Sequence, residues 1–226
     1  MAFDKDAYLR FLVSSGVVGF FPEGRKLKSG RVSHWYANCR VLSDTAGSLE
    51  KLAGFVLDFV KGLNIEYDYF FGIPEGSTKL GIILNYLKAE QEDDPQHPIV
   101  MGRGKEKSHG DPRDRFVIGP LKEGDRIVAV EDVATTGGSM LETVNRLIES
   151  HVRVEALIVL VDRLEQTESG LSVEEEVNEL ELRYCQLSTA EDILPLCIRE
   201  NPPPDELIAE IEEDFRTYGA RELKLR

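Results

Sequence analysis

Residues 127–139 read Ile-Val-Ala-Val-Glu-Asp-Val-Ala-Thr-Thr-Gly-Gly-Ser. The apolar start, Ile127–Val130, alternates little and is typical of a strand that is buried on both faces. Two carboxylates, Glu131 and Asp132, follow at its carboxyl end, where open α/β sheets bind their ligands. The Thr-Thr-Gly-Gly-Ser loop then supplies hydroxyls, backbone N–H groups and a helix N-terminus, which together favour a bound phosphate. Taken alone, the loop is equally typical of a well-capped strand–helix turn without a ligand.

Apolar patterns on both sides of this stretch predict alternating strands and helices. Strands are expected at 69–73, 99–101, 126–131 and 154–161, and helices at 78–91 and 139–150. This alternation indicates an α/β fold with a central parallel sheet flanked by helices. Outside it, we expect helices at 4–15, 48–61 (capped by Ser48), 189–197 and from about 205, a β-like stretch at 32–41, and a short strand after 183.

The composition narrows the class of protein. The 226 residues, 42% of them apolar, suffice for one domain with its own core. No apolar run approaches the roughly 20 residues that cross a bilayer, and the charged N-terminus lacks a secretory signal. Three widely spaced cysteines (Cys39, Cys185 and Cys197) form no Cys-x-x-Cys pair, which is typical of free thiols in a reducing cytoplasm.

Charge is unevenly spread along the chain. The net charge of −14 argues against a nucleic-acid-binding surface. Glu165–Arg226 contains 17 acidic and 6 basic residues, whereas Arg25–Arg31 has four cations and no acid, and Arg103–Arg115 has five cations against three acids. We expect 102–114 to be a mobile loop, because few apolar residues anchor it. The two cationic loops indicate a small polyanionic ligand, although basic loops without a ligand would have the same composition.

Several other chemistries lack their motifs. There is no Gly-x-x-x-x-Gly-Lys-Ser/Thr phosphate loop, and the run from Gly102 has Lys107 where a dinucleotide-binding motif needs its third glycine. Gly137–Leu141 lacks the last glycine of a hydrolase nucleophile elbow. The four histidines (His34, His97, His109 and His151) share no metal-ligand spacing.

Residues 127–139 also resemble the phosphoribosyl-pyrophosphate (PRPP) loop of type I phosphoribosyltransferases. In that family the acidic pair holds the ribose hydroxyls and the following loop holds the 5-phosphate. The resemblance therefore implies PRPP contacts from Glu131, Asp132, Val133, Ala134, Thr135, Thr136, Gly137, Gly138 and Ser139.

Four further segments resemble orotate phosphoribosyltransferases, over nearly the whole chain from about Leu9 to Tyr218. Residues 27–38 are similar to the loop whose lysine, here Lys28, lies near PRPP and orotate, and whose aromatic, here Tyr36, stacks on the pyrimidine. His34 and Ala37 depart from the pattern, where a proline and a second aromatic are frequent. A basic edge strand with buried aromatics would show the same residues.

Residues 71–77 resemble the pyrophosphate loop of these enzymes, with Glu75 and Gly76 as the implied contacts. A glycine- and serine-rich turn lets backbone N–H groups approach a pyrophosphate closely. Many relatives carry a lysine at the position of Gly76, so contacts there would come from the backbone, with Lys79 as a candidate substitute.

Residues 103–110 resemble the catalytic loop, in which Arg103, Lys107 and His109 match and Gly104 replaces a lysine. Lys105 is a candidate substitute for that lysine. Cations that close over the leaving pyrophosphate stabilise its developing charge and exclude water. The resemblance implies PRPP contacts from Arg103, Gly104, Lys107 and His109, and a homodimer whose 102–114 loop is shared between subunits.

Residues 161–165, Val-Asp-Arg-Leu-Glu, resemble the segment whose arginine, here Arg163, pairs with the orotate carboxylate. On its own such a segment is most often a surface ion-pair cluster. Together with the other loops, it implies an orotate site formed by Lys28, Tyr36, Ala37, Thr135 and Arg163.

The resemblance implies one type I phosphoribosyltransferase domain over 1–226, without a fused decarboxylase. We expect a small N-terminal hood mainly within 1–45, a core of about 48–190 and C-terminal helices over about 189–226. Mg²⁺ would be carried mainly by PRPP oxygens and water rather than by protein ligands. Two alternatives stay open, a related transferase for another base and a non-catalytic PRPP-binding regulator. Lys107 and His109 argue against the second, because a regulator has no need of cations at a leaving group.

Overall fold

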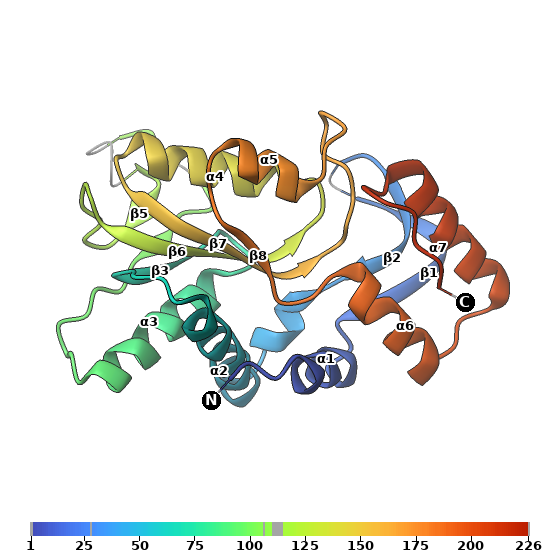
Figure 1. Ribbon diagram of the computed structural model, residues 1–226, viewed down its shortest axis with the longest axis horizontal. Coiled ribbons are helices and arrows are strands. Elements are labelled where there is room, and N and C mark those ends of the chain that lie inside the picture. The colour runs from blue at the N-terminus through green and yellow to red at the C-terminus, as the bar shows by residue number, and fades with distance from the viewer. Residues whose placement is uncertain (1, 28, 106, 110–114, 226) are drawn as a thin grey trace.

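The computed structural model describes residues 2–27, 29–105, 107–109 and 115–225 (Figure 1). Its centre is a parallel sheet in the strand order β3 (Tyr69–Gly72), β6 (Arg126–Ala134), β7 (Arg153–Asp162), β8 (Tyr184–Gln186). Helices α3 (Thr78–Glu92) and α4 (Gly138–Glu149) connect the first three strands. The predicted α/β fold with a central parallel sheet flanked by helices is confirmed.

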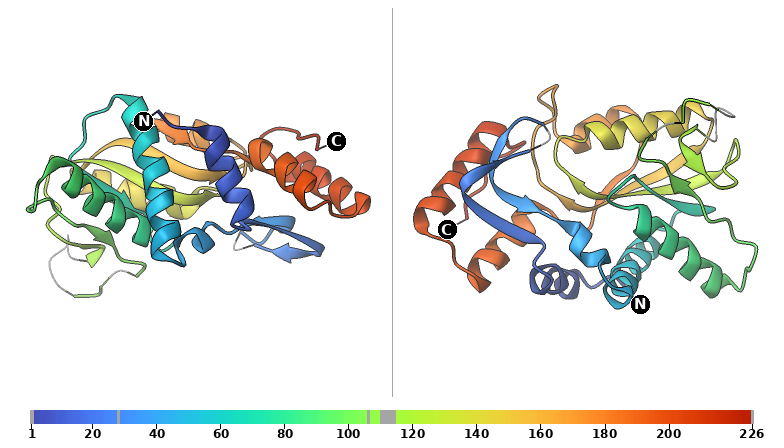
Figure 2. Two further views of the ribbon diagram at one scale, coloured as in Figure 1. Left: turned by 90° about the horizontal axis from the view of Figure 1, so that it is seen from below. Right: turned by 180° about the vertical axis from the view of Figure 1, so that it is seen from behind.

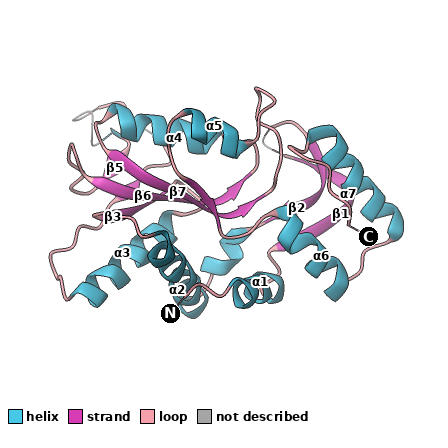
Figure 3. Ribbon diagram, viewed as in Figure 1, coloured by secondary structure: helices cyan, strands magenta, loops and turns pink. Residues whose placement is uncertain are grey.

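The sheet separates two apolar cores. Successive residues of β6 face opposite sides, as the alternation of side chains along a strand requires. Val128 and Val130 pack with α2 (Ala46–Leu63) and α3, whereas Ile127 and Ala129 pack with α4 and α5 (Val173–Glu179). Figures 1 and 3 show these helices as two layers, one on each face of the sheet.

A β-hairpin lies beside the C-terminal helices. Its antiparallel strands are β1 (Val18–Lys26) and β2 (Val32–Ala37), and the short helix η1 (Cys39–Ser43) follows them. Strand β2 contacts α7 (Asp205–Tyr218), as the rear view in Figure 2 shows. Helix α1 (Lys5–Ser14) contacts α6 (Ala190–Glu200).

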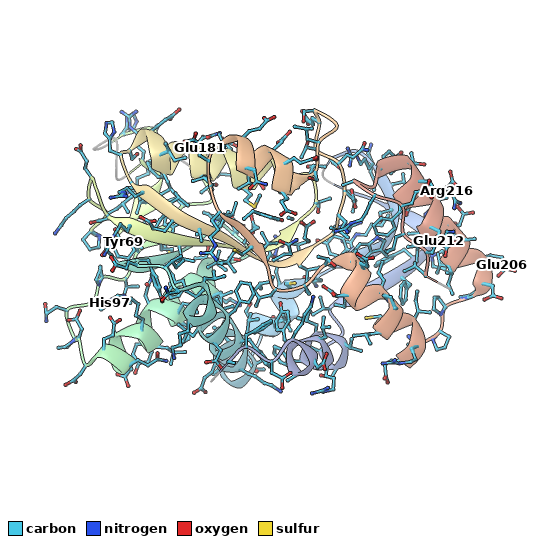
Figure 4. All side chains as sticks on the ribbon, viewed as in Figure 1. Tyr69, His97, Glu181, Glu206, Glu212 and Arg216 are labelled. Carbon is cyan, nitrogen blue, oxygen red and sulfur yellow. The ribbon has the colours of Figure 1, made fainter. Side chains whose placement is uncertain are left out.

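Helix α7 is strongly amphipathic. Its inner side buries Leu207, Ile208, Ile211 and Phe215, while Glu206 and Arg216 are exposed on its outer side (Figure 4). The exposed acidic side chains of α7 therefore lie on the solvated side of a helix whose other side makes an apolar contact.

Several sequence predictions need correction. Helix α2 begins at Ala46, and its cap is Thr45 rather than Ser48, which instead completes a capping box with Thr45. The strand expected at 99–101 is β4 (Met101–Gly102), which pairs antiparallel with β5 (Val117–Ile118) outside the main sheet. The β-like stretch from Val32 ends at Ala37, because the chain then turns into η1.

Four elements were not predicted: β1, β5, η1 and α5. Strand β1 contains Gly19, Pro22 and Gly24, residue types that are depleted in strands. Helix α5 has only seven residues, three of them consecutive glutamates. Across the part of the chain that the structure describes, no helix is both long enough and apolar enough to cross a membrane.

Candidate active site

A cleft of about 410 Å³ lies at the carboxyl end of β6, next to the hairpin. It is lined from the hairpin by Arg25, Lys26, Leu27, Ser29 and Tyr36, and from the sheet side by Glu131, Val133–Met140 and Glu168. The polar residues of 127–139 thus lie at the edge of the sheet where parallel sheets bind ligands.

The acidic loop (residues 131–139) begins with two carboxylates that face different surroundings. Glu131 is 6% exposed, and its Oε1 accepts a hydrogen bond from the Asp132 backbone N–H at 2.9 Å. The Asp132 Oδ1 accepts one from the Val133 N–H at 2.9 Å. Burial raises the pKa of Glu131 above its usual range, and the negative charge of Asp132 adds to this, while Arg40 opposes it. A ligand that donates hydroxyl protons to this pair would stabilise its ionised form.

The rest of the acidic loop forms the start of α4. Gly137 precedes the helix with φ 71°, a left-handed conformation that glycine adopts without strain. Among the described residues, no side chain caps this helix. Its N-terminal N–H groups and the positive end of its dipole therefore face the cleft without a capping side chain.

The glycine turn (residues 73–77) connects β3 to α3 and lies against the acidic loop. The peptide between Pro74 and Glu75 is cis. A Cβ added at Gly76 would collide with the Asp132 carboxylate, so the absence of a side chain lets the two segments meet. Ser77 is buried, and its hydroxyl has no hydrogen-bond partner within the described part of the chain. Lys79, the candidate substitute for the lysine that is absent at Gly76, donates a hydrogen bond to the Ser43 carbonyl oxygen at 3.0 Å.

The cationic segment (residues 103–109) leaves β4 and begins beside the glycine turn. A Cβ added at Gly104 would collide with the Glu75 carboxylate. The Arg103 N–H donates to the Phe116 carbonyl at 2.8 Å. Lys107 and His109 are exposed and do not line the cleft, whereas Glu106 and residues 110–114 lie outside the described residues. The mobility expected for 102–114 stays a prediction.

The predicted base-binding residues do not all line the cleft. Tyr36 and Thr135 line the cleft, but Ala37 is buried and Arg163 has no exposed surface. Lys28 lies outside the described residues. The cleft also presents residues to which no individual role was given, namely Arg25, Lys26, Leu27, Ser29, Met140 and Glu168. The cation-rich run 25–31 was the sequence signal for the four of these residues that lie within it.

Arg163 is enclosed by protein groups. Its Nε donates to Glu165 Oε1 at 2.8 Å and its Nη2 to Ser33 Oγ at 2.9 Å. Its guanidinium carbon lies 4.2 Å from the Trp35 ring centroid. Burial lowers the pKa of Arg163, and the charge of Glu165 opposes that effect. In this state the guanidinium makes its charged contact with Glu165.

Known proteins with similar sequences were found, although no family model matches the chain. The chain is 32% identical over 170 residues to the orotate phosphoribosyltransferase of Thermococcus gammatolerans, which covers 74% of this chain and 83% of that protein. This chain belongs to the orotate phosphoribosyltransferase family. The orotate phosphoribosyltransferase of Mannheimia succiniciproducens is 28% identical over 221 residues, or 95% of this chain and 97% of that protein.

The fold agrees with membership of the orotate phosphoribosyltransferase family. The crystal structure of the Francisella tularensis orotate phosphoribosyltransferase has a TM-score of 0.70 and 20% sequence identity, covering 94% of this chain and 99% of that one. The cleft described above therefore lies in a fold that this family shares.

Proposed function

We propose that this chain transfers the phosphoribosyl group of PRPP to orotate, giving orotidine 5-monophosphate and pyrophosphate, a step of pyrimidine biosynthesis. The observation that supports this most directly is one cleft that combines the buried Glu131 carboxyl group with an uncapped glycine-rich helix start. Carboxylates suit the ribose hydroxyls and the helix start suits a phosphate, so the two halves of the acidic loop fit the two ends of a ribose 5-phosphate.

In the proposed complex, Glu131 and Asp132 accept hydrogen bonds from the ribose hydroxyls. Residues 133–139 donate backbone N–H and hydroxyl groups to the 5-phosphate. The glycine turn, with Glu75 and Gly76, lies beside Asp132 and binds the pyrophosphate, chiefly through backbone groups. The Ser77 hydroxyl, which has no hydrogen-bond partner among the described residues, supports a polar ligand near this turn.

The chemical step joins orotate N1 to the ribose C1 as the bond from C1 to the pyrophosphate oxygen breaks, and the leaving pyrophosphate takes up the proton that N1 releases. Arg103, Lys107 and His109 stabilise the charge that develops on the leaving pyrophosphate, and Gly104 lets this segment approach Glu75. Lys107 and His109 are exposed and do not line the cleft of their own chain. This supports a homodimer in which residues 102–114 act at the neighbouring site.

On the base side, Tyr36 stacks on the pyrimidine and Thr135 faces it across the cleft. Ala37 belongs to the same strand as Tyr36, and Lys28, which lies outside the described residues, is the proposed cation on this side. Arg163 is the proposed partner of the orotate carboxylate from beneath the cleft, and reaching it requires Glu165 to release the guanidinium.

The residues fit Mg²⁺ held mainly by substrate. Within the described residues, no group of three or more His, Cys, Asp and Glu side chains could hold a metal ion, while Glu131 and Asp132 offer two carboxylates near the ribose. Mg²⁺ favours phosphate oxygens and water, and would neutralise charge on the leaving group. We place the enzyme in the cytoplasm, as a single domain over 1–226 that binds neither nucleic acid nor membranes.

The decisive experiment follows the loss of orotate absorbance with PRPP and Mg²⁺. We expect turnover by the wild type and a loss of about 100-fold or more in kcat for Lys107→Ala, the typical cost of removing one transition-state charge contact. Lys61→Ala, which removes an exposed cation from α2, is the matched control and should retain full activity. PRPP binding without turnover on any base would support the regulator instead, and turnover on another base alone would refute orotate as substrate.

Mixing two inactive variants tests the shared loop. Lys107→Ala and Asp132→Asn homodimers should each be inactive. In a mixed dimer, one site combines an intact acidic loop with the partner's intact Lys107, so activity should reappear after subunit exchange. If each loop serves its own subunit, no mixed dimer contains an intact site and activity stays absent.

A further inference from the structure

The cleft contains a guanidinium that the described protein leaves without an anion. Arg25 lines the cleft, and its guanidinium carbon lies 4.5 Å from the Tyr36 ring centroid and 5.4 Å from that of Phe21. Apart from these ring contacts, no described group forms a hydrogen bond or ion pair with the Arg25 side chain. Its donors are therefore available to a ligand.

The backbone of β1 directs Arg25 to this place. The register of the hairpin shifts between Phe20 and Arg25, and Arg25 then pairs with Ser33. Within the irregular stretch, Gly24 has φ 67° and a Cβ there would collide with Val32, so a glycine is required. Irregularities of this kind commonly redirect a side chain next to an active site. The hairpin thus sets the Arg25 guanidinium on the face of Tyr36.

Arg25 and Arg163 differ in what already binds them. Arg163 has no exposed surface and contacts Glu165, Ser33 and Trp35, whereas Arg25 is exposed at the cleft. A carboxylate that enters from solvent therefore meets Arg25 first and competes there with an aromatic ring rather than with a carboxylate. A fork-shaped charged pair is stronger than an exposed cation–π contact.

We propose that Arg25 is a specificity-determining residue that recognises the carboxylate of the incoming base. In the free protein its guanidinium covers the ring face on which the base stacks. When the base binds, the guanidinium leaves that face and pairs with the carboxylate at the mouth of the cleft. This inference rests on the proposed function, because it takes the base to be a carboxylated pyrimidine.

The test compares three substitutions at Arg25 by steady-state kinetics. For Arg25→Gln we expect the KM for orotate to rise about 10-fold or more, the effect of losing a charged hydrogen-bonded pair, with the KM for PRPP within twofold. Arg25→Lys keeps the charge without the fork and should recover part of the loss. Arg25→Met can still cover Tyr36 but has no charge, so it should resemble Arg25→Gln.

Control variants distinguish a specific role of Arg25 from a packing role and from failure of the proposed function. Arg153→Gln removes an exposed arginine from the opposite end of the sheet and should leave both KM values unchanged. An unchanged orotate KM in Arg25→Gln would overturn the proposal, and so would full recovery in Arg25→Met, which would assign Arg25 a packing role. If the wild type does not consume orotate, the proposed function itself fails, and the role of Arg25 fails with it.

Discussion

Glu131 is 6% exposed near the carboxyl end of β6. Burial, together with the charge of Asp132, raises its pKa above the ordinary value of 4.5. From about pH 4.5 up to that raised pKa, the unfolded chain has released the proton and the native chain retains it. Stability therefore falls as the pH rises through this range. A carboxylate that lowers stability where it lines a cleft is typical of a ligand-binding group.

Glu131→Gln should stabilise the ligand-free protein and weaken PRPP binding. The amide oxygen can still accept from the Asp132 N–H, but the ionisable group is gone. At pH 7 we expect a gain of about 1 kcal/mol, or about 2–4 °C in Tm, that disappears below about pH 4.5. Thermal melts from pH 4 to 8 and calorimetric PRPP titration measure both effects. Glu142→Gln, on the exposed side of α4, should change neither, and a lower Tm for Glu131→Gln at pH 7 would contradict the assignment.

Among the elements, helix α2 shows how a local signal places a boundary. The Thr45 side chain accepts from the Ser48 N–H at 3.2 Å, and the Thr45 N–H donates to Ser48 Oγ at 3.3 Å. The helix buries Leu52, Val56 and Val60 against the rest of the core. Its cap stabilises one core helix without contacting the cleft.

Thr45→Ala should therefore lower stability and leave the kinetics unchanged. Losing such a cap costs about 1 kcal/mol, which corresponds to a Tm lower by about 2–4 °C in a chain of this length. Thermal melts and the two KM values are the measurements. Thr217→Ala, at an exposed position of α7, should shift stability by less than about 0.5 kcal/mol. A changed orotate KM in Thr45→Ala would show that α2 influences the cleft.

At the scale of the whole molecule, the C-terminal helix supports the hairpin that carries the base side of the cleft. The His34 N–H donates to Asp214 Oδ2 at 2.8 Å. The rings of Trp35 and Phe215 stack with their centroids 6.2 Å apart. Because Trp35 and Tyr36 are neighbours on β2, the position of Tyr36 depends on a helix about 180 residues away in the chain.

Phe215→Ala should therefore weaken orotate binding as well as stability. Removing a buried aromatic side chain costs about 3–5 kcal/mol. Leu147→Ala is the matched control, since it opens a cavity on the other face of the sheet. At a temperature where both variants are folded, we expect a raised orotate KM only in Phe215→Ala. Equal KM values in the two variants would show that Tyr36 is held by the hairpin alone.

The parallel sheet, its long helices and the position of the acidic loop could be predicted from the sequence alone. Strands β3, β6 and β7 were predictable because strands that are buried on both faces form continuous apolar runs. Helices α3 and α4 were predictable because burial of one face imposes a period of 3.6 residues. Strand β1 was missed because its glycines and proline serve a bend rather than a regular ladder. The proposed contacts of the acidic loop come from neighbouring residues of one short segment, so its ligand chemistry could be predicted from those residue types without a structure.

Which cations face the cleft became visible only in the packed molecule. Arg163 lies in a segment whose sequence fits either a surface ion pair or a ligand contact, yet it is buried between Glu165 and residues of β2 about 130 positions away. Arg25 drew attention only as part of a basic run, yet it lies on Tyr36. Such contacts depend on how separate elements pack, and local periodicity carries no information about that packing.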